Sequence, residues 1–233
     1  MSSASSNRLL STLSRNASAL LAPHLAPVEL ALRQHIERPG EDISHVYFVT
    51  SGIVSVVARS SQHDSIEAGL IGCEGMTGIA VVMANHRSPH EAFVQLEGAA
   101  QRLEAEQLRI AMRRSEEISN VLLRFAHVFS TQVTHTALAN ARAKIEERLA
   151  RWLLMVHDRV AGDEASLTHE FIAIMLGVRR PGVTDALHLL EGKGLIRATR
   201  GVVRIVDREG LELLAGGAYG VPEREYRRLL GER

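Results

Sequence analysis

The basic side chains that could bind an anionic polymer gather in residues 165–206. This segment holds six basic and three acidic residues, a local excess of three positive charges. The chain of 233 residues has 27 basic and 27 acidic residues, so the remainder carries three excess negative charges. Nucleic acids are bound by such local basic surfaces, and a zero net charge therefore does not exclude them. The six basic residues are Arg179, Arg180, Lys193, Arg197, Arg200 and Arg204.

Residues 166–207 contain a helix-turn-helix pattern. Thr168 is a favourable N-cap for a short helix ending at Leu176, and Gly177-Val178 provides a tight turn. The next helix begins at Arg179-Arg180-Pro181, where proline is tolerated because its missing N–H has no intrahelical partner. The outer face of this second helix is polar. The expected shared core consists of Ile172, Leu176, Val178, Val183, Leu187 and Leu190.

The segment LIRATRGVVRIV is typical of a β-hairpin that turns at Arg200-Gly201. Pairing outward from the turn gives one apolar face and places Arg197 opposite Arg204. Like charges at directly opposed positions destabilise a hairpin unless an anion lies nearby, and a DNA phosphate would serve. Alternatively, both arginines extend into water. The apolar face comprises Ile196, Ala198, Val203 and Ile205.

The first half of the chain has a different pattern of apolar and turn-forming residues. Leucines near helical spacing, interrupted by Pro23 and Pro27, predict short amphipathic helices over residues 1–36. Residues 40–108 show short apolar runs, including two that are split by Ser51-Gly52, between glycine, proline and asparagine turns. This pattern predicts a small antiparallel β-barrel or jelly roll.

A long helix is predicted to follow, over the segment SEEISNVLLRFAHVFSTQVTHTALANA. Its apolar residues alternate steps of four and three, the spacing of a coiled-coil seam. Such a helix can lie on the barrel alone or also pair with its twin in a dimer, and we favour the dimer. A second helix follows in KIEERLARWLLMVHDRV. The expected dimerisation residues are Ile118, Leu122, Phe125 and Phe129.

The segment LTHEFIAIMLGVRRPGVTDAL resembles the winged-helix DNA-binding domain of the Crp/Fnr family of bacterial transcription regulators. PGEDISHVYFVTSGIVSVV likewise resembles the opening strands of that family's cyclic-nucleotide-binding-like barrel. The resemblance covers about residues 30–206. It implies an α+β fold with a sensor domain (1–112), a dimerisation helix (113–142) and a winged helix-turn-helix domain (143–233).

The resemblance also implies which residues contact DNA. Arg180 matches the family's recognition-helix arginine, and we expect it to bind a guanine edge or a phosphate. Pro181 stands in place of the usual glutamate and Asp185 in place of a second arginine, so the family's best-known operators cannot be carried over. The expected DNA-binding residues are Thr168, His169, Arg179, Arg180, Thr184, His188, Arg197, Arg200 and Arg204.

Residues 75–78 match the segment with which cyclic-nucleotide-binding members of the family hold the nucleotide, but they differ from its usual sequence. We refer to these four residues as the altered cassette. Met76 replaces the glutamate that holds the ribose hydroxyl, and a thioether is only a weak acceptor. The phosphate pair is Arg87-Ser88 in one alignment and His90-Glu91 in another. We therefore expect no cofactor, and an effector other than cAMP or none. The candidate ligand-pocket residues are Gly75, Met76, Thr77, Gly78, Arg87, Ser88 and His90.

These features predict a sequence-specific DNA-binding regulator that acts as a homodimer on a two-fold-symmetric operator and contacts RNA polymerase if it is an activator. The alternative is a ligand-sensing or protein-interaction module whose winged helix binds protein. The sequence contains no nucleophile–base constellation, Walker loop or dinucleotide fingerprint, so we do not expect an enzyme. Cys73 is the only cysteine, and no signal peptide or long apolar run is present. We expect a cytoplasmic protein with no metal site and no membrane association.

Overall fold

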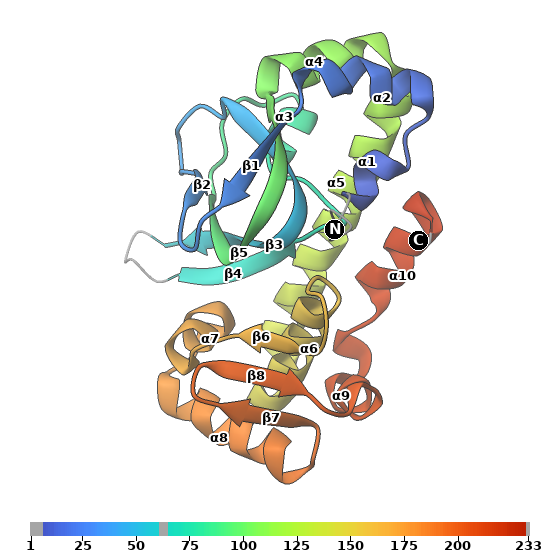
Figure 1. The fold of residues 1–233 in the computed structure, drawn as a ribbon. Helices are drawn as coiled ribbons and strands as arrows, with labels where there is room; N and C mark the ends of the chain where they lie inside the picture. The colour runs from blue at the N-terminus through green and yellow to red at the C-terminus, as the bar shows by residue number, and fades with distance from the viewer. Residues whose placement is uncertain (1–6, 61–64, 232–233) are drawn as a thin grey trace. The chain divides into compact units, whose positions relative to one another are not determined.

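The computed structural model describes residues 7–60 and 65–231 (Figure 1). Contacts divide the chain into two compact units. Unit 1 comprises Met1–Val56, Ile71–Ser130 and Arg224–Arg233, and unit 2 comprises Val57–Leu70 and Thr131–Glu223. Both units therefore contain segments that are distant in sequence. The functional division predicted from the sequence stays a prediction. It comprises a sensor domain (1–112), a dimerisation helix (113–142) and a winged helix-turn-helix domain (143–233).

The first half of the chain forms one antiparallel sheet with the order β1-β5-β3-β4, and β2 also pairs with β5. This sheet confirms an α+β fold with an N-terminal antiparallel β domain. Two of the strands are much longer than the short runs expected, at 15 residues for β3 and 14 for β5. The strands are β1 (Ala26–Leu30), β2 (His35–Glu37), β3 (His45–Arg59), β4 (Ser65–Ile71) and β5 (Glu91–Glu104).

Ser51-Gly52 does not split two strands, because β3 runs through it. Gly52 has a φ of 81°, and a Cβ there would collide with the Leu96 carbonyl oxygen of β5. A Cβ on Gly98 of β5 would likewise collide with the Ser51 backbone. The two glycines thus permit a close approach of neighbouring strands rather than a turn.

The N-terminal segment is only partly helical. Short helices are present as expected in its first part, as α1 (Arg8–Ser11), α2 (Arg15–Leu21) and the 3-10 turn η1 (Ala22–His24). From Ala26 onward, the strands β1 and β2 are found where the sequence predicted further helix. The expectation fails because both strands pair with the distant strand β5, with Ala26 opposite Arg102. Residues 1–6 lie outside the described part of the chain.

Two helices lie on either side of β5 in the chain. The short α3 (Ile79–Val82) precedes β5, and α4 (Ala105–Arg114) begins directly where β5 ends. The predicted β region over residues 40–108 is therefore wrong after Glu104, where the helix-favouring segment AEQLRIAMRR forms α4.

The long helix α5 (Glu116–Arg142) is confirmed, but its apolar seam lies inside unit 1. Ile118, Leu122 and Phe125 are at most 3% exposed and belong to the same core cluster as the buried strand residues, while Phe129 is half-buried against it. Phe125 packs so closely on Gly75 that a Cβ there would overlap its ring. This burial contradicts the expected dimer seam, because these side chains already have partners in their own chain.

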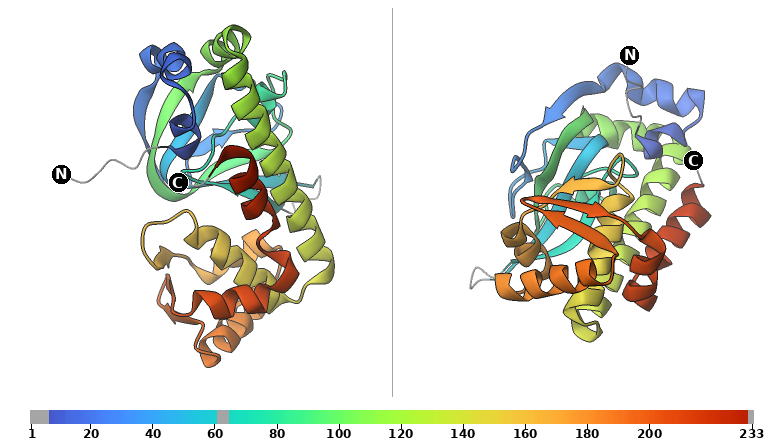
Figure 2. Two further views of the ribbon diagram at one scale, coloured as in Figure 1. Left: turned by 90° about the vertical axis from the view of Figure 1, so that its right-hand side faces the viewer. Right: turned by 60° about the horizontal axis from the view of Figure 1, so that its bottom comes forward.

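Both ends of the described chain pack into unit 1. The Asn7 side chain donates hydrogen bonds to the carbonyl oxygens of Val49 (2.8 Å) and Gly75 (2.7 Å). The C-terminal helix α10 (Val221–Leu230) lies beside α5, as Figures 1 and 2 show. Tyr226 of α10 donates a 3.0 Å hydrogen bond to the Glu74 carbonyl oxygen and packs against the unit 1 core.

Unit 2 combines helices with a small sheet. Its strands follow the order β6-β8-β7, both pairs antiparallel. The elements are α6 (Ile145–His157), β6 (Glu164–Ser166), α7 (His169–Leu176), α8 (Arg180–Gly192), β7 (Ile196–Thr199), β8 (Val202–Ile205), α9 (Arg208–Ala215) and the 3-10 turn η2 (Gly216–Ala218). No helix in residues 7–60 and 65–231 is long and apolar enough to cross a membrane.

Candidate nucleic-acid interface

The helix-turn-helix begins and ends on local signals. The Thr168 hydroxyl caps α7 by accepting a 3.2 Å hydrogen bond from the Phe171 N–H. Gly177 ends α7 in the left-handed conformation with a φ of 60°, and the Val178 N–H then bonds back to the Ala173 carbonyl oxygen at 3.0 Å. The predicted bounds of the first helix, the turn after it and the start of the second helix are confirmed.

The core between α7 and α8 also matches the expectation. Five of the six predicted residues are at most 4% exposed, and Val178 is half-buried in the turn. With this face buried, the polar face of α8 remains on the surface. The five buried residues are Ile172, Leu176, Val183, Leu187 and Leu190.

All nine side chains expected to contact DNA are exposed or half-buried. His169 and Thr184 are half-buried and joined, with 3.1 Å between the imidazole Nδ1 and the hydroxyl oxygen. The contact ties the start of α7 to the first turns of α8. Arg179 is the N-cap of α8, and Arg180 is its first residue, so both lie at the N-terminal end of that helix. The exposed residues are Thr168, Arg179, Arg180, His188, Arg197, Arg200 and Arg204.

The hairpin has the predicted register. Arg197 lies opposite Arg204 and Ile196 opposite Ile205, with Gly201 at a φ of 77° in the turn. Ile196, Val203 and Ile205 are at most 9% exposed, so one face is apolar and the other carries the arginines.

A third strand, β6, was missed by sequence reasoning. It pairs with β8 and places Glu164 opposite Arg204, on the side away from Arg197. The wing therefore supplies an acidic neighbour for one of its two adjacent arginines. Three residues without apolar alternation carry no strand signal, which explains the omission.

A second unpredicted feature joins the wing to α8. The Glu191 carboxylate accepts a 2.7 Å hydrogen bond from the Ala198 N–H of β7. Because Glu191 lies near the end of α8, this bond fixes the wing with respect to the helix that carries Arg180. The interface is thus one rigid set of exposed side chains rather than separate loops.

A helix pair with a glycine turn, followed by a stranded wing, defines a winged helix-turn-helix, a class of DNA-binding domain. Residues 147–214 match the family model of the Crp-like helix-turn-helix domain. The chain therefore contains a Crp-like helix-turn-helix domain, and it shares its overall fold with solved structures of Crp/Fnr-family regulators. A comparison with curated protein sequences finds no match.

Solved structures share the fold over most of the chain. FixK2 from Bradyrhizobium japonicum is 17% identical with a TM-score of 0.72, and the match covers 84% of this chain and 99% of that one. A CRP-family transcriptional regulator from Thermus thermophilus is 22% identical with a TM-score of 0.68, covering 83% and 98%. The c-di-GMP-responsive regulator CLP from Xanthomonas campestris is 17% identical with a TM-score of 0.65, covering 82% and 99%.

The altered cassette in unit 1 is packed rather than open. Met76 and Thr77 are both fully buried. Thr77 pairs with the backbone of Tyr47, its hydroxyl accepting a 3.1 Å hydrogen bond from the Tyr47 N–H. A Cβ on Gly78 would collide with Val46. These side chains contribute to the core of unit 1.

Glu37 occupies the remaining polar part of the cassette. Its carboxylate accepts a 2.7 Å hydrogen bond from the Gly78 N–H, while the Ser88 hydroxyl donates to the His90 carbonyl oxygen at 3.1 Å. Burial raises the pKa of Glu37, and the Gly78 N–H and the Ser88 hydroxyl oppose that rise only in part. No sequence signal pointed to Glu37, because its partners are remote in the chain.

Two further candidate ligand residues, Arg87 and His90, lie next to Ser88 in the chain and bond to groups other than Glu37. The Arg87 side chain is exposed and forms a 2.6 Å ion pair with Asp42. The His90 N–H donates a 3.1 Å hydrogen bond to the Ser88 hydroxyl. The structure thus brings Gly78 and Ser88 together around Glu37, with Arg87 directed to another carboxylate. Within the described residues, no three His, Cys, Asp or Glu side chains gather as metal ligands.

Proposed function

We propose that this protein is a sequence-specific DNA-binding transcription regulator that acts by binding rather than by catalysis. The observation that carries the proposal is the exposed basic surface of the winged helix-turn-helix, with Arg179 and Arg180 at the start of α8 and Arg197, Arg200 and Arg204 on the wing. The α8 arginines contact base edges or phosphates in the major groove, and the wing arginines contact phosphates.

The regulator acts as a homodimer on a two-fold-symmetric operator. An excess of three charges is small for one DNA-binding module, and two copies provide the necessary affinity. The helix α5 offers a second stripe at steps of four and three, on residues that are all exposed. Paired chains would present two copies of α8 to half-sites roughly 34 Å apart. This stripe consists of Leu123, His127, Ser130, Thr134, Ala137 and Ala141.

The sensor part does not bind cAMP. The Glu37 carboxylate occupies the Gly78 amide, the Ser88 hydroxyl bonds with the His90 backbone, and Met76 is in the core, so a cyclic phosphate and a ribose hydroxyl lack free partners there. A thermal shift with cAMP or cGMP at micromolar concentration would overturn this point. Cyclic di-GMP is a useful third probe, since the Xanthomonas regulator that shares the fold responds to it.

The experiment that tests DNA binding is selection of duplexes from a random pool by the full-length protein, followed by affinity measurements over a salt series. We expect an enriched sequence with two-fold symmetry, and a steep fall in affinity as salt is added. A protein-interaction module would enrich no sequence and would retain a protein partner at the same salt. If the protein is an activator, the bound complex would also contact RNA polymerase.

A further inference from the structure

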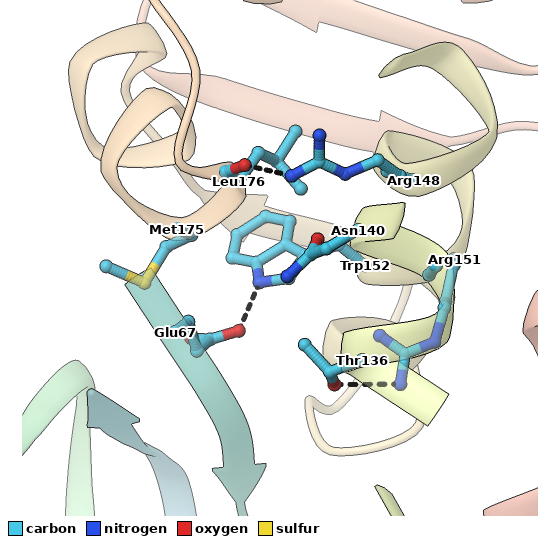
Figure 3. Close-up of a pocket in the computed structure, with 9 residues that line it drawn as sticks. Glu67, Thr136, Asn140, Arg148, Arg151, Trp152, Met175 and Leu176 are labelled. Carbon is cyan, nitrogen blue, oxygen red and sulfur yellow. Dashed lines mark hydrogen bonds between the residues drawn. The ribbon is translucent and has the colours of Figure 1, made fainter. Parts of the chain in front are cut away.

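The strand β4 contacts the helix-turn-helix inside unit 2. The indole N–H of Trp152 on α6 donates a 2.8 Å hydrogen bond to Glu67 on β4, and Figure 3 shows the two side chains facing one another. Trp152 is 3% exposed and Glu67 4%. A carboxylate buried to this extent is costly unless it is hydrogen-bonded, so a polar residue at this position needs an explanation.

The residue before Glu67 reaches the turn of the helix-turn-helix itself. A Cβ on Gly177 would meet the side chain of Ile66, so the strand packs directly on the residue where α7 ends. Further along β4, the Gln132 side chain of α5 accepts a 2.6 Å hydrogen bond from the Leu70 N–H and donates one of 3.2 Å to its carbonyl oxygen. The strand is therefore held at both ends within this unit.

The same junction extends to the end of α7. Arg148, one turn before Trp152 on α6, donates a hydrogen bond to the Leu176 carbonyl oxygen. Met175 and Leu176 line a small cavity together with Trp152 and Glu67, as Figure 3 shows. Three elements, β4, α6 and the end of α7, thus meet through hydrogen bonds and direct packing.

We infer that Ile66 and Glu67 are positioning residues for DNA recognition, which hold the turn between α7 and α8 through Gly177 and Trp152. The inference rests on the proposed DNA-binding function.

The test compares the double variant Glu67→Leu/Trp152→Phe with the wild type. Replacing both buried partners removes the hydrogen bond without leaving a polar group unpaired. The smaller phenyl ring also costs core packing, so unfolding of the variant is measured beside DNA binding. An unaligned recognition helix loses base contacts even where the variant stays folded. The probes are a duplex selected by the wild-type protein and a scrambled duplex of equal length. We expect about a tenfold weaker affinity for the selected duplex and a change within about twofold for the scrambled one.

Two further variants sharpen the result. Glu67→Gln keeps an oxygen acceptor for the indole and is expected to retain wild-type selectivity, while Glu29→Leu on the exposed side of β1 is the matched control. Equal weakening on both duplexes, or unchanged selectivity in the double variant, overturns the positioning role. If the wild-type protein selects no duplex, the proposed function fails instead, so the two failures are distinguishable.

Discussion

The Gly78 N–H donates a 2.7 Å hydrogen bond to the Glu37 carboxylate, so the chain's own acid fills the polar end of the altered cassette. In an anion-binding loop this amide would face a ligand. Here the ligand position is taken by a residue from β2, and burial of that carboxylate raises its pKa. The contact therefore makes the stability of unit 1 dependent on pH.

Glu37→Gln is expected to stabilise the protein increasingly as pH rises above about 4.5. A raised pKa means that the folded state binds a proton more tightly than the unfolded state, so wild-type stability falls as pH rises through the interval between the two pKa values. The amide cannot ionise and removes this loss. Urea unfolding at a series of pH values measures it, with exposed Glu41→Gln as the control. A difference that shrinks as pH rises would contradict the assignment.

Arg180→Ala should weaken binding to the selected duplex by about 1–3 kcal/mol and change binding to a scrambled duplex much less. The reason is that Arg180 lies exposed in the first turn of α8, where a guanine edge is within reach of a recognition helix. Fluorescence anisotropy on both duplexes measures the ratio. Arg15→Ala, on the exposed side of α2, serves as the control, and equal losses on both duplexes would reassign Arg180 to phosphate contact.

Arg204→Ala should weaken binding to all duplexes alike. Arg204 is exposed on the wing beside Arg197, a position suited to a phosphate rather than a base. Removing one phosphate contact lowers the slope of log affinity against log salt by about one for each bound protomer. A titration in increasing salt checks the slope. An unchanged slope would mean that the arginine extends into water.

Leu123→Glu combined with Ala137→Glu is expected to produce monomers that lose operator affinity. Both residues belong to the exposed stripe of α5, so charges there hinder pairing without entering the core. Sedimentation velocity measures the change. A dimer that persists would place the interface elsewhere.

Phe125→Glu provides the contrast on the same helix. Phe125 is 3% exposed in the unit 1 core, and burying an unpaired charge costs several kcal/mol. We expect this variant to lose the thermal transition of unit 1, whatever the oligomeric state of the protein. If the Phe125→Glu protein is folded and monomeric, the dimer surface is the seam around Phe125, as the sequence predicted.

The DNA-binding end of the molecule was predictable because its signals are local. Thr168 caps one helix, Gly177 ends it, and the turn at Gly201 fixes the whole register of the wing, including Arg197 opposite Arg204. Each of these features depends on neighbours within a few residues, which is the range over which sequence patterns determine backbone geometry.

The N-terminal β domain was harder to predict because its contacts join residues that are remote in the chain. The 4-3 spacing from Ile118 to Phe125 correctly indicated a buried helix face, but periodicity does not say which surface covers it. Glu37 meets Gly78 across 41 positions, and Glu67 meets Trp152 across 85. Pairings at such separations are set by the tertiary fold, and no local pattern encodes them.

The return of α10 to unit 1 has a consequence for how the protein is made. Synthesis proceeds from the N-terminus, so Tyr226, which bonds to Glu74, emerges after every residue of unit 2. The contacts between α10 and the rest of unit 1 therefore form only after the residues of unit 2 have been synthesised. A chain shortened before Arg224 would keep the helices of its helix-turn-helix and lack a segment that packs on its first-synthesised half.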